Sequence, residues 1–86
     1  MDEVIELCNK VRADHGLPPV SALEKGEKKS QCDCPISKTI KADSKLSVIT
    51  GVTSLIVGGK PYYLNYKAQI FVQAFDNGFF PELEIK

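Results

Sequence analysis

The chain has 86 residues, which is enough for one small domain with a modest hydrophobic core. Hydrophobic residues make up 43% and charged residues 26%, proportions that are ordinary for a globular protein. The formal net charge of zero disfavours a general nucleic-acid binder, and no apolar run approaches the roughly 20 residues that cross a bilayer. We therefore expect a single domain over residues 1–86, with no membrane partner.

The first predicted element is a helix over residues 2–14. Its apolar side chains recur with the spacing of one helix face, namely Val4, Ile5, Leu7, Cys8 and Val11. Asp2 and Glu3 suit the positive N-terminal end of a helix, and Gly16 is placed to end it. This pattern predicts a helix with one face in the core and the other in solvent.

The segment that follows is mostly polar. Ser21 and Glu24 have the spacing of a capping box, and Gly26 comes two residues later, so we predict one short turn of helix over residues 21–24. Residues 27–31 are polar and rich in lysine, which predicts an exposed loop. A longer helix is then predicted to begin after Cys34, because Pro35 suits a first helical position, where its missing N–H would lack a partner.

This helix is predicted to fade over residues 42–44, after which the period of the apolar residues changes to two. The β-branched runs at 46–50 and 52–57 predict two strands. Gly58-Gly59 predicts a hairpin turn, and a third strand is predicted at residues 61–64. Because this strand contains proline, which has no N–H to donate, we expect it at the edge of the sheet.

Helical periodicity returns from Asn65 through Phe75, and Gly78 is placed to end this last helix. Residues 82–86 stay unassigned. Together, the elements predict an α+β fold with a helical N-terminal half, a small antiparallel sheet of two or three strands, and a packed C-terminal helix.

The three cysteines are Cys8, Cys32 and Cys34. An odd number, in a chain whose acidic start does not resemble a secretory signal, predicts reduced thiols and a cytoplasmic location. With His15 the cysteines match a Cys₃His zinc site by count. However, Cys8 and His15 would lie about 10.5 Å apart along one helix. We therefore expect no zinc and no other cofactor.

Cys34 raises a second chemical possibility, because it stands at a helix start with Lys38 one turn further on. A catalytic thiol also needs a base and an oxyanion site, and His15 is the only histidine. A small buried core residue is the favoured alternative for Cys34. The sequence therefore predicts a protein without enzymatic activity.

Charge is unevenly distributed along the chain. Residues 1–24 carry an excess of acidic groups, whereas six lysines gather in the next segment: Lys25, Lys28, Lys29, Lys38, Lys41 and Lys45. The element order also resembles a winged helix, with residues 34–42 as the recognition helix and Gly58-Gly59 as the wing tip. In this alternative the lysines contact phosphates. The recognition helix offers no Arg, Asn or Gln for reading bases, so DNA binding is the second choice.

Phe79 and Phe80 follow the end of the last helix, and the short tail after them is too short to cover both rings. Either they form an exposed patch that binds a partner or a second copy of the chain, or they fold back as a lid on the core. The two alternatives carry equal weight, and the hypothesis is that at least one of the two rings forms part of a self- or partner-binding surface. The sequence thus predicts a small non-enzymatic protein-interaction module.

Three segments resemble a pattern of small uncharacterised proteins of actinobacteria and their phages. They are Arg12 to Gly16, Cys34 to Ile40 and Phe71 to Leu83, and the stretch from the first to the last spans most of the chain. Each is built of capping and core residues, and Cys8 and Cys32 have no place in the pattern. The resemblance implies a shared fold and a phage-type origin, and it implies no activity.

Overall fold

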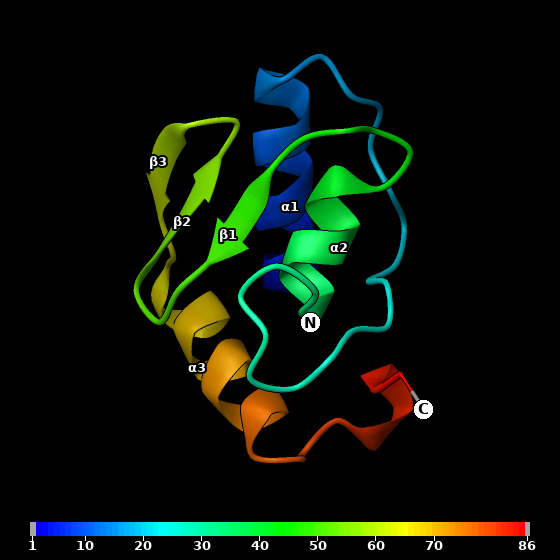
Figure 1. The fold of residues 1–86 in the computed structure, drawn as a ribbon, viewed down its shortest axis with the longest axis vertical. Coiled ribbons are helices and arrows are strands. Elements are labelled where there is room, and N and C mark those ends of the chain that lie inside the picture. Colours follow the sequence, from blue (N-terminus) through cyan, green and yellow to red (C-terminus); the bar gives the residue numbers. More distant parts are fainter. Residues whose placement is uncertain (1, 86) are drawn as a thin grey trace.

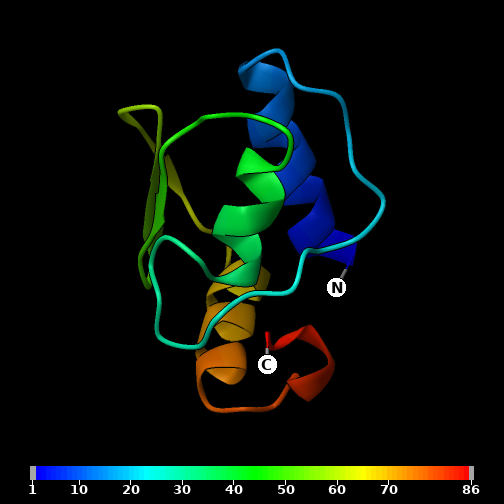
Figure 2. The same ribbon diagram turned by 45° about the vertical axis from the view of Figure 1, so that its right-hand side comes forward.

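Three helices and a three-stranded antiparallel sheet form the fold, so it is α+β as predicted. The structure is a computed structural model that describes residues 2–85. The elements are α1 (Asp2–Asp14), α2 (Pro35–Lys41), β1 (Val48–Thr50), β2 (Ser54–Val57), β3 (Lys60–Tyr63), α3 (Tyr66–Asp76) and a 3₁₀ turn, η1 (Pro81–Leu83). Helix α2 lies between β1 and α1, and α3 runs away from one end of the sheet (Figure 1). No helix of the described residues covers the other face of the sheet (Figure 2).

The strands follow the chain in the order β1-β2-β3, so β1 and β3 are both edges. Val48 pairs with Val57, and Leu55 pairs with Tyr62, which places these side chains on the face toward the helices. Ile49 and Ile56 pair on the opposite face and are exposed. The predicted third strand and its position at an edge are therefore confirmed.

The glycines predicted to end helices do so by a shared mechanism. Gly16 and Gly78 both have a positive φ, 74° and 84° respectively. At the end of α1 the N–H of Leu17 donates to the Arg12 carbonyl at 2.9 Å, and the N–H of Gly16 donates to that of Ala13 at 3.1 Å. This pair of bonds is a Schellman motif, in which a left-handed residue turns the chain back over the last helical carbonyls.

The predicted helical turn at residues 21–24 is wrong, because this segment runs extended beside α1 and α2. The Asn9 side chain donates to the Val20 carbonyl at 2.9 Å and accepts from the Val20 N–H at 2.8 Å. The N–H of Glu24 donates to the Thr39 hydroxyl at 2.8 Å. Since side chains of both helices take up these backbone groups, the segment gains more from docking than from one helical turn.

Gly26 does not end a helix; it allows two segments to meet. Its N–H donates to the Leu83 carbonyl at 2.8 Å, and its carbonyl accepts from the Ile85 N–H at 3.0 Å, which forms an isolated parallel bridge. A Cβ atom on Gly26 would lie 2.5 Å from backbone atoms of Asp33, Cys34 and Pro35. Only glycine allows this approach, so the loop at Gly26 packs against the start of α2 while it pairs with the C-terminal tail.

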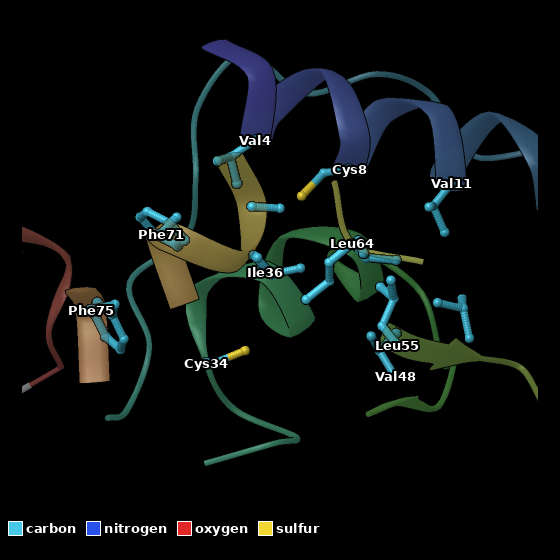
Figure 3. Close-up of a cluster of buried hydrophobic side chains, with 13 residues drawn as sticks. Val4, Cys8, Val11, Cys34, Ile36, Val48, Leu55, Leu64, Phe71 and Phe75 are labelled. Carbon is cyan, nitrogen blue, oxygen red and sulfur yellow. The ribbon is translucent and has the colours of Figure 1, made fainter. Parts of the chain in front are cut away.

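The hydrophobic core fills the space between the sheet and the helices (Figure 3). It comprises the side chains of Val4, Cys8, Val11, Cys34, Ile36, Ile40, Val48, Leu55, Val57, Leu64, Ala68, Phe71 and Phe75. Helix α2 is the central element, because five of its seven residues are buried. It contributes Ile36 and Ile40, neither of which has any exposed surface.

Arg12 is also buried, with 1% of its surface exposed, although it is charged. Its Nη1 donates to the carbonyls of Thr39, Ile40 and Ala42 at 2.9–3.0 Å, and its Nε donates to that of Pro18 at 2.8 Å. These carbonyls lie at the C-terminal end of α2 and in the connector after α1. The guanidinium therefore caps α2, where the helix dipole is negative.

In the described part of the chain, every helix is too short or too polar to cross a bilayer.

Candidate protein-interaction surface

The end of α3 fixes the position of Phe79. The N–H of Gly78 donates to the Phe75 carbonyl and the N–H of Phe79 to the Ala74 carbonyl, both at 3.0 Å, which is a second Schellman motif. The motif sets the backbone of Phe79 beside the last turn of the helix. The Phe79 side chain nevertheless remains 73% exposed. This exposure identifies it as one half of the predicted patch.

Phe80 behaves differently from its neighbour. Its ring lies 5.0 Å from the Phe71 ring, measured between centroids, and it packs on the edge of the core. The two alternatives for these residues therefore apply to one each. Phe80 is the lid on the core, and Phe79 is the exposed aromatic residue.

A groove of about 190 Å³ opens between α1 and α3 next to these residues. It is lined by Glu3, Val4, Lys67, Ile70, Phe71, Ala74 and Phe80. The buried side chains of Val4 and Phe71 meet where α1 and α3 come together (Figure 3). Most of the lining is apolar, and Glu3 and Lys67 supply one charge of each sign.

One side of α3 continues the apolar character of the groove. Tyr66, Ile70 and Ala74 follow at intervals of four residues and so share a helix face. Tyr66 is 73% exposed and Ile70 is 45% exposed. We call Tyr66, Ile70, Phe79 and the adjoining groove the α3 surface. Sequence periodicity assigned α3 to the core but did not reveal this second, exposed face.

Cys34 is a core residue at the N-terminus of α2, as favoured from the sequence. It caps the helix, with its Sγ accepting from the N–H of Ser37 at 3.5 Å. A pocket of about 230 Å³ beside it is also lined by Lys29, Thr50 and Asp76. This volume is smaller than the roughly 300–1,000 Å³ typical of ligand pockets.

His15 is not placed to act as a base for Cys34. Arg12, one turn before His15, binds the C-terminal end of α2, whereas Cys34 caps its N-terminal end. The two side chains therefore lie toward opposite ends of α2. Instead, Nε2 of His15 lies 3.1 Å from the hydroxyl of Tyr62.

The three thiols are in different surroundings. Cys8 is fully buried. Its thiol pKa is raised to about 12, mainly by burial and to a smaller extent by the nearby Cys34. Cys34 is buried and Cys32 is exposed. Among the residues that the structure describes, no three His, Cys, Asp or Glu side chains are grouped to hold a metal ion.

These surroundings predict that one thiol per folded chain reacts rapidly with a thiol reagent at pH 8. Cys32 is expected to react, because the other two are shielded from solvent and Cys8 stays protonated. Counting released chromophore before and after unfolding measures this. The Cys32→Ser variant should lose the rapid phase, and rapid reaction of two or three thiols in the native protein would contradict the structure.

The six lysines do not surround a free helix. Lys28 pairs with Glu84 at 3.5 Å, and the Lys41 ammonium donates to the Cys32 carbonyl at 2.7 Å. Helix α2, the recognition helix of the winged-helix alternative, is mostly buried. The second helix that the alternative requires is absent from residues 21–24. These positions do not favour the insertion of α2 into a DNA groove.

A polar cluster at the other end of the molecule was not predicted. The Tyr62 hydroxyl donates to Asp14 at 2.9 Å, and the Lys60 ammonium lies 3.2 Å from the same carboxylate oxygen. The pKa of Asp14 is lowered, mainly by the hydrogen bond from Tyr62 and secondly by the one from Lys60. The pKa of Tyr62 is raised, mainly by burial and secondly by its hydrogen bond to Asp14. The cluster ties β3 to the end of α1. The residues that bond one another across it are 46 to 48 residues apart in sequence, so no local motif marks them.

No family model, curated protein or solved structure matches the chain.

Proposed function

We propose that this protein is a non-enzymatic protein-interaction module that acts in the cytoplasm and binds a host or self partner through the α3 surface. The exposure of Phe79 carries the proposal. Its ring is 73% exposed, and the Schellman motif that ends α3 holds its backbone beside Ala74, one of the residues that line the apolar groove. A phage-type origin, implied by the resemblance of three segments, is part of the same proposal.

The energetics of apolar burial support this role. Full burial of a phenylalanine side chain contributes about 1.5–3 kcal/mol, so Phe79 can supply a large part of the affinity at a contact. Binding energy at protein interfaces is concentrated in a few such aromatic residues, which fill pockets on the partner. The adjacent groove offers the complementary feature, a site for an apolar side chain of the partner.

The arrangement of polar groups favours binding over catalysis. His15 and Asp14 are both engaged with Tyr62, and neither lines the groove or the pocket beside Cys34. An activated nucleophile needs a base within hydrogen-bond reach. For residues 25–31, a solvated lysine-rich loop is a simpler interpretation than a DNA-binding surface.

The two phenylalanines are expected to respond differently to alanine substitution. Phe79→Ala should change the free energy of unfolding by less than about 0.5 kcal/mol, because its ring makes little contact with the fold. Phe80→Ala should lower it by about 2 kcal/mol, because the contact with Phe71 is lost. This loss is smaller than for a fully buried ring, because Phe80 is only partly buried. Urea unfolding followed by circular dichroism measures both. Similar losses for the two variants would show that Phe79 belongs to the core.

The proposed function is tested with peptides selected from a random display library on the wild-type protein. We expect the selected peptides to bind Phe79→Ala at least tenfold more weakly than the wild type. Tyr63→Ala is the matched control, because Tyr63 on β3 is an aromatic residue with 89% exposure outside the α3 surface. Equal binding to the wild type and Phe79→Ala would contradict the proposal.

A further inference from the structure

We propose that Asn77 is a site of covalent modification, at which its side-chain amide is lost after attack by the backbone nitrogen of Gly78. Asn77 lies outside the α3 surface, so the modification needs no partner. Three observations support it: the residue that follows Asn77, the hydrogen bonds at the end of α3, and the position of the Lys28 ammonium.

The reaction uses only the chain and water. The Gly78 nitrogen forms a bond to the side-chain carbonyl carbon of Asn77, and the amide group takes up the proton from that nitrogen and leaves as ammonia. The five-membered imide that results takes up one water molecule, which opens it at either carbonyl. The products are aspartate and isoaspartate, in which the main chain runs through the side-chain carbon. Glycine favours the attack, because it has no Cβ to hinder the close approach of its backbone.

Asn77 is the only one of the three asparagines that precedes glycine. The other two, Asn9 and Asn65, precede a lysine and a tyrosine. Their side chains also hold positions inside the fold, because Asn9 is bonded twice to the Val20 backbone and Asn65 caps the start of α3. Asn77 is exposed at the opposite end of that helix. It is therefore the asparagine of this chain that is most open to attack.

The end of α3 controls the rate, because it holds both reacting groups. The N–H of Gly78 donates to the Phe75 carbonyl at 3.0 Å, and the side-chain amide of Asn77 donates to the Gln73 carbonyl at 2.9 Å. Both bonds must break before the nitrogen can turn toward the side chain. Since the last turn of a helix opens at a small cost in free energy, we expect the reaction in the folded protein, but more slowly than in the unfolded chain.

The Lys28 side chain places a positive charge beside the attacking residue. Its Nζ lies 3.9 Å from the position of a Cβ on Gly78, and that position and the Gly78 nitrogen are bonded to the same Cα. Lys28 pairs with Glu84 at 3.5 Å, and the N–H of Lys29 ties the loop to Asp76 at 2.8 Å. A nearby positive charge stabilises the negative charge that develops as the nitrogen loses its proton. The ammonium therefore assists the reaction once the end of α3 has opened.

Both products change the end of α3. Aspartate adds a negative charge at the C-terminal end of the helix, where the dipole is already negative. Isoaspartate lengthens the main chain by one carbon, so the N–H groups of Gly78 and Phe79 no longer match the carbonyls of Phe75 and Ala74. Modification of Asn77 therefore loosens the Schellman motif that holds the backbone of Phe79.

Incubation of the full chain at pH 8, followed by proteolysis and mass spectrometry of the peptides, tests the site. Asn77 should exchange NH for O at least tenfold faster than Asn9 and Asn65 in the folded protein. It should react at least threefold faster in guanidinium chloride, where α3 is unfolded. Isoaspartate among the products identifies the imide route. If Asn77 reacts no faster than the other two, or equally fast with and without denaturant, the proposal is wrong.

Two variants isolate the charge of Lys28. Lys28→Met removes the ammonium together with its ion pair to Glu84, whereas Glu84→Gln removes the same ion pair and keeps the ammonium. In the folded protein, Asn77 should react at least twofold more slowly in Lys28→Met than in Glu84→Gln. In guanidinium chloride the two rates should agree, because the loop no longer holds Lys28 beside Gly78. Equal rates in the folded variants would contradict the assistance by Lys28.

Discussion

Replacing Arg12 by methionine is expected to lower the free energy of unfolding by about 4 kcal/mol, a larger effect than that of any other substitution proposed for this chain. Methionine keeps an unbranched stem of similar length but removes all the donors. Four backbone carbonyls, at Pro18, Thr39, Ile40 and Ala42, then lose their bond to the guanidinium, and the Thr39 carbonyl keeps its second partner, the Ala42 N–H at 3.4 Å. At about 1 kcal/mol for each lost bond the sum is a large part of the 5–15 kcal/mol that stabilises a small domain.

Two further substitutions make the Arg12 experiment specific. Arg12→Lys keeps the positive charge without the planar arrangement of donors, so it should give an intermediate loss. Lys10→Met removes a charge from the exposed side of the same helix and should change stability by less than about 0.5 kcal/mol. Urea unfolding measures all three. A loss below about 1 kcal/mol for Arg12→Met would show that water replaces the guanidinium at the end of α2.

Gly26→Ala is expected to lower the free energy of unfolding by about 3 kcal/mol, because the added methyl group overpacks a rigid site. The new Cβ would lie 2.5 Å from three backbone atoms, which cannot rotate away as a side chain would. The loop must move, and the bridge to the tail must lengthen. We therefore also expect the Ile85 amide, which donates to Gly26, to exchange hydrogen faster with solvent.

Gly59→Ala is the control for Gly26→Ala. Gly59 has a φ of 85°, so alanine is strained there, but nothing lies within 4 Å of its Cβ position. The backbone strain of alanine at a positive φ should by itself lower the free energy of unfolding by about 1 kcal/mol. If both variants lose the same stability, the close approach at Gly26 has no effect of its own.

The main elements were predictable because their signals are local. The apolar spacing and Gly16 defined α1, and the change of period after α2 defined the sheet. Arg12 was missed although it lies in the apolar stripe, four residues after Cys8 and one after Val11. A charged residue on the inner face of a helix is a signal for a buried cap, and it was present in the sequence.

Other features depended on distant contacts and could not be predicted. The capping-box spacing at residues 21–24 was genuine, but the Thr39 hydroxyl takes the Glu24 N–H that the Ser21 side chain would have bonded, and Asn9 holds the backbone of the preceding Val20. The choice between patch and lid at Phe79 and Phe80 depended on Phe71, which faces only the second of them. Local sequence defines an element's propensity, whereas the packing of other segments decides which of its groups remain exposed.

The two edges of the sheet bear on how this protein avoids aggregation. An edge strand grows by offering free N–H and C=O groups to an incoming strand. On β3, Pro61 has no N–H, and on β1 the N–H of Thr50 already donates to the Gln31 carbonyl at 2.8 Å. Each edge therefore has one donor fewer to offer, although Ile49 and Ile56 expose apolar surface on the open face of the sheet. The pairing of an incoming strand with either edge, which is the first step of fibril growth, is therefore hindered at these two positions.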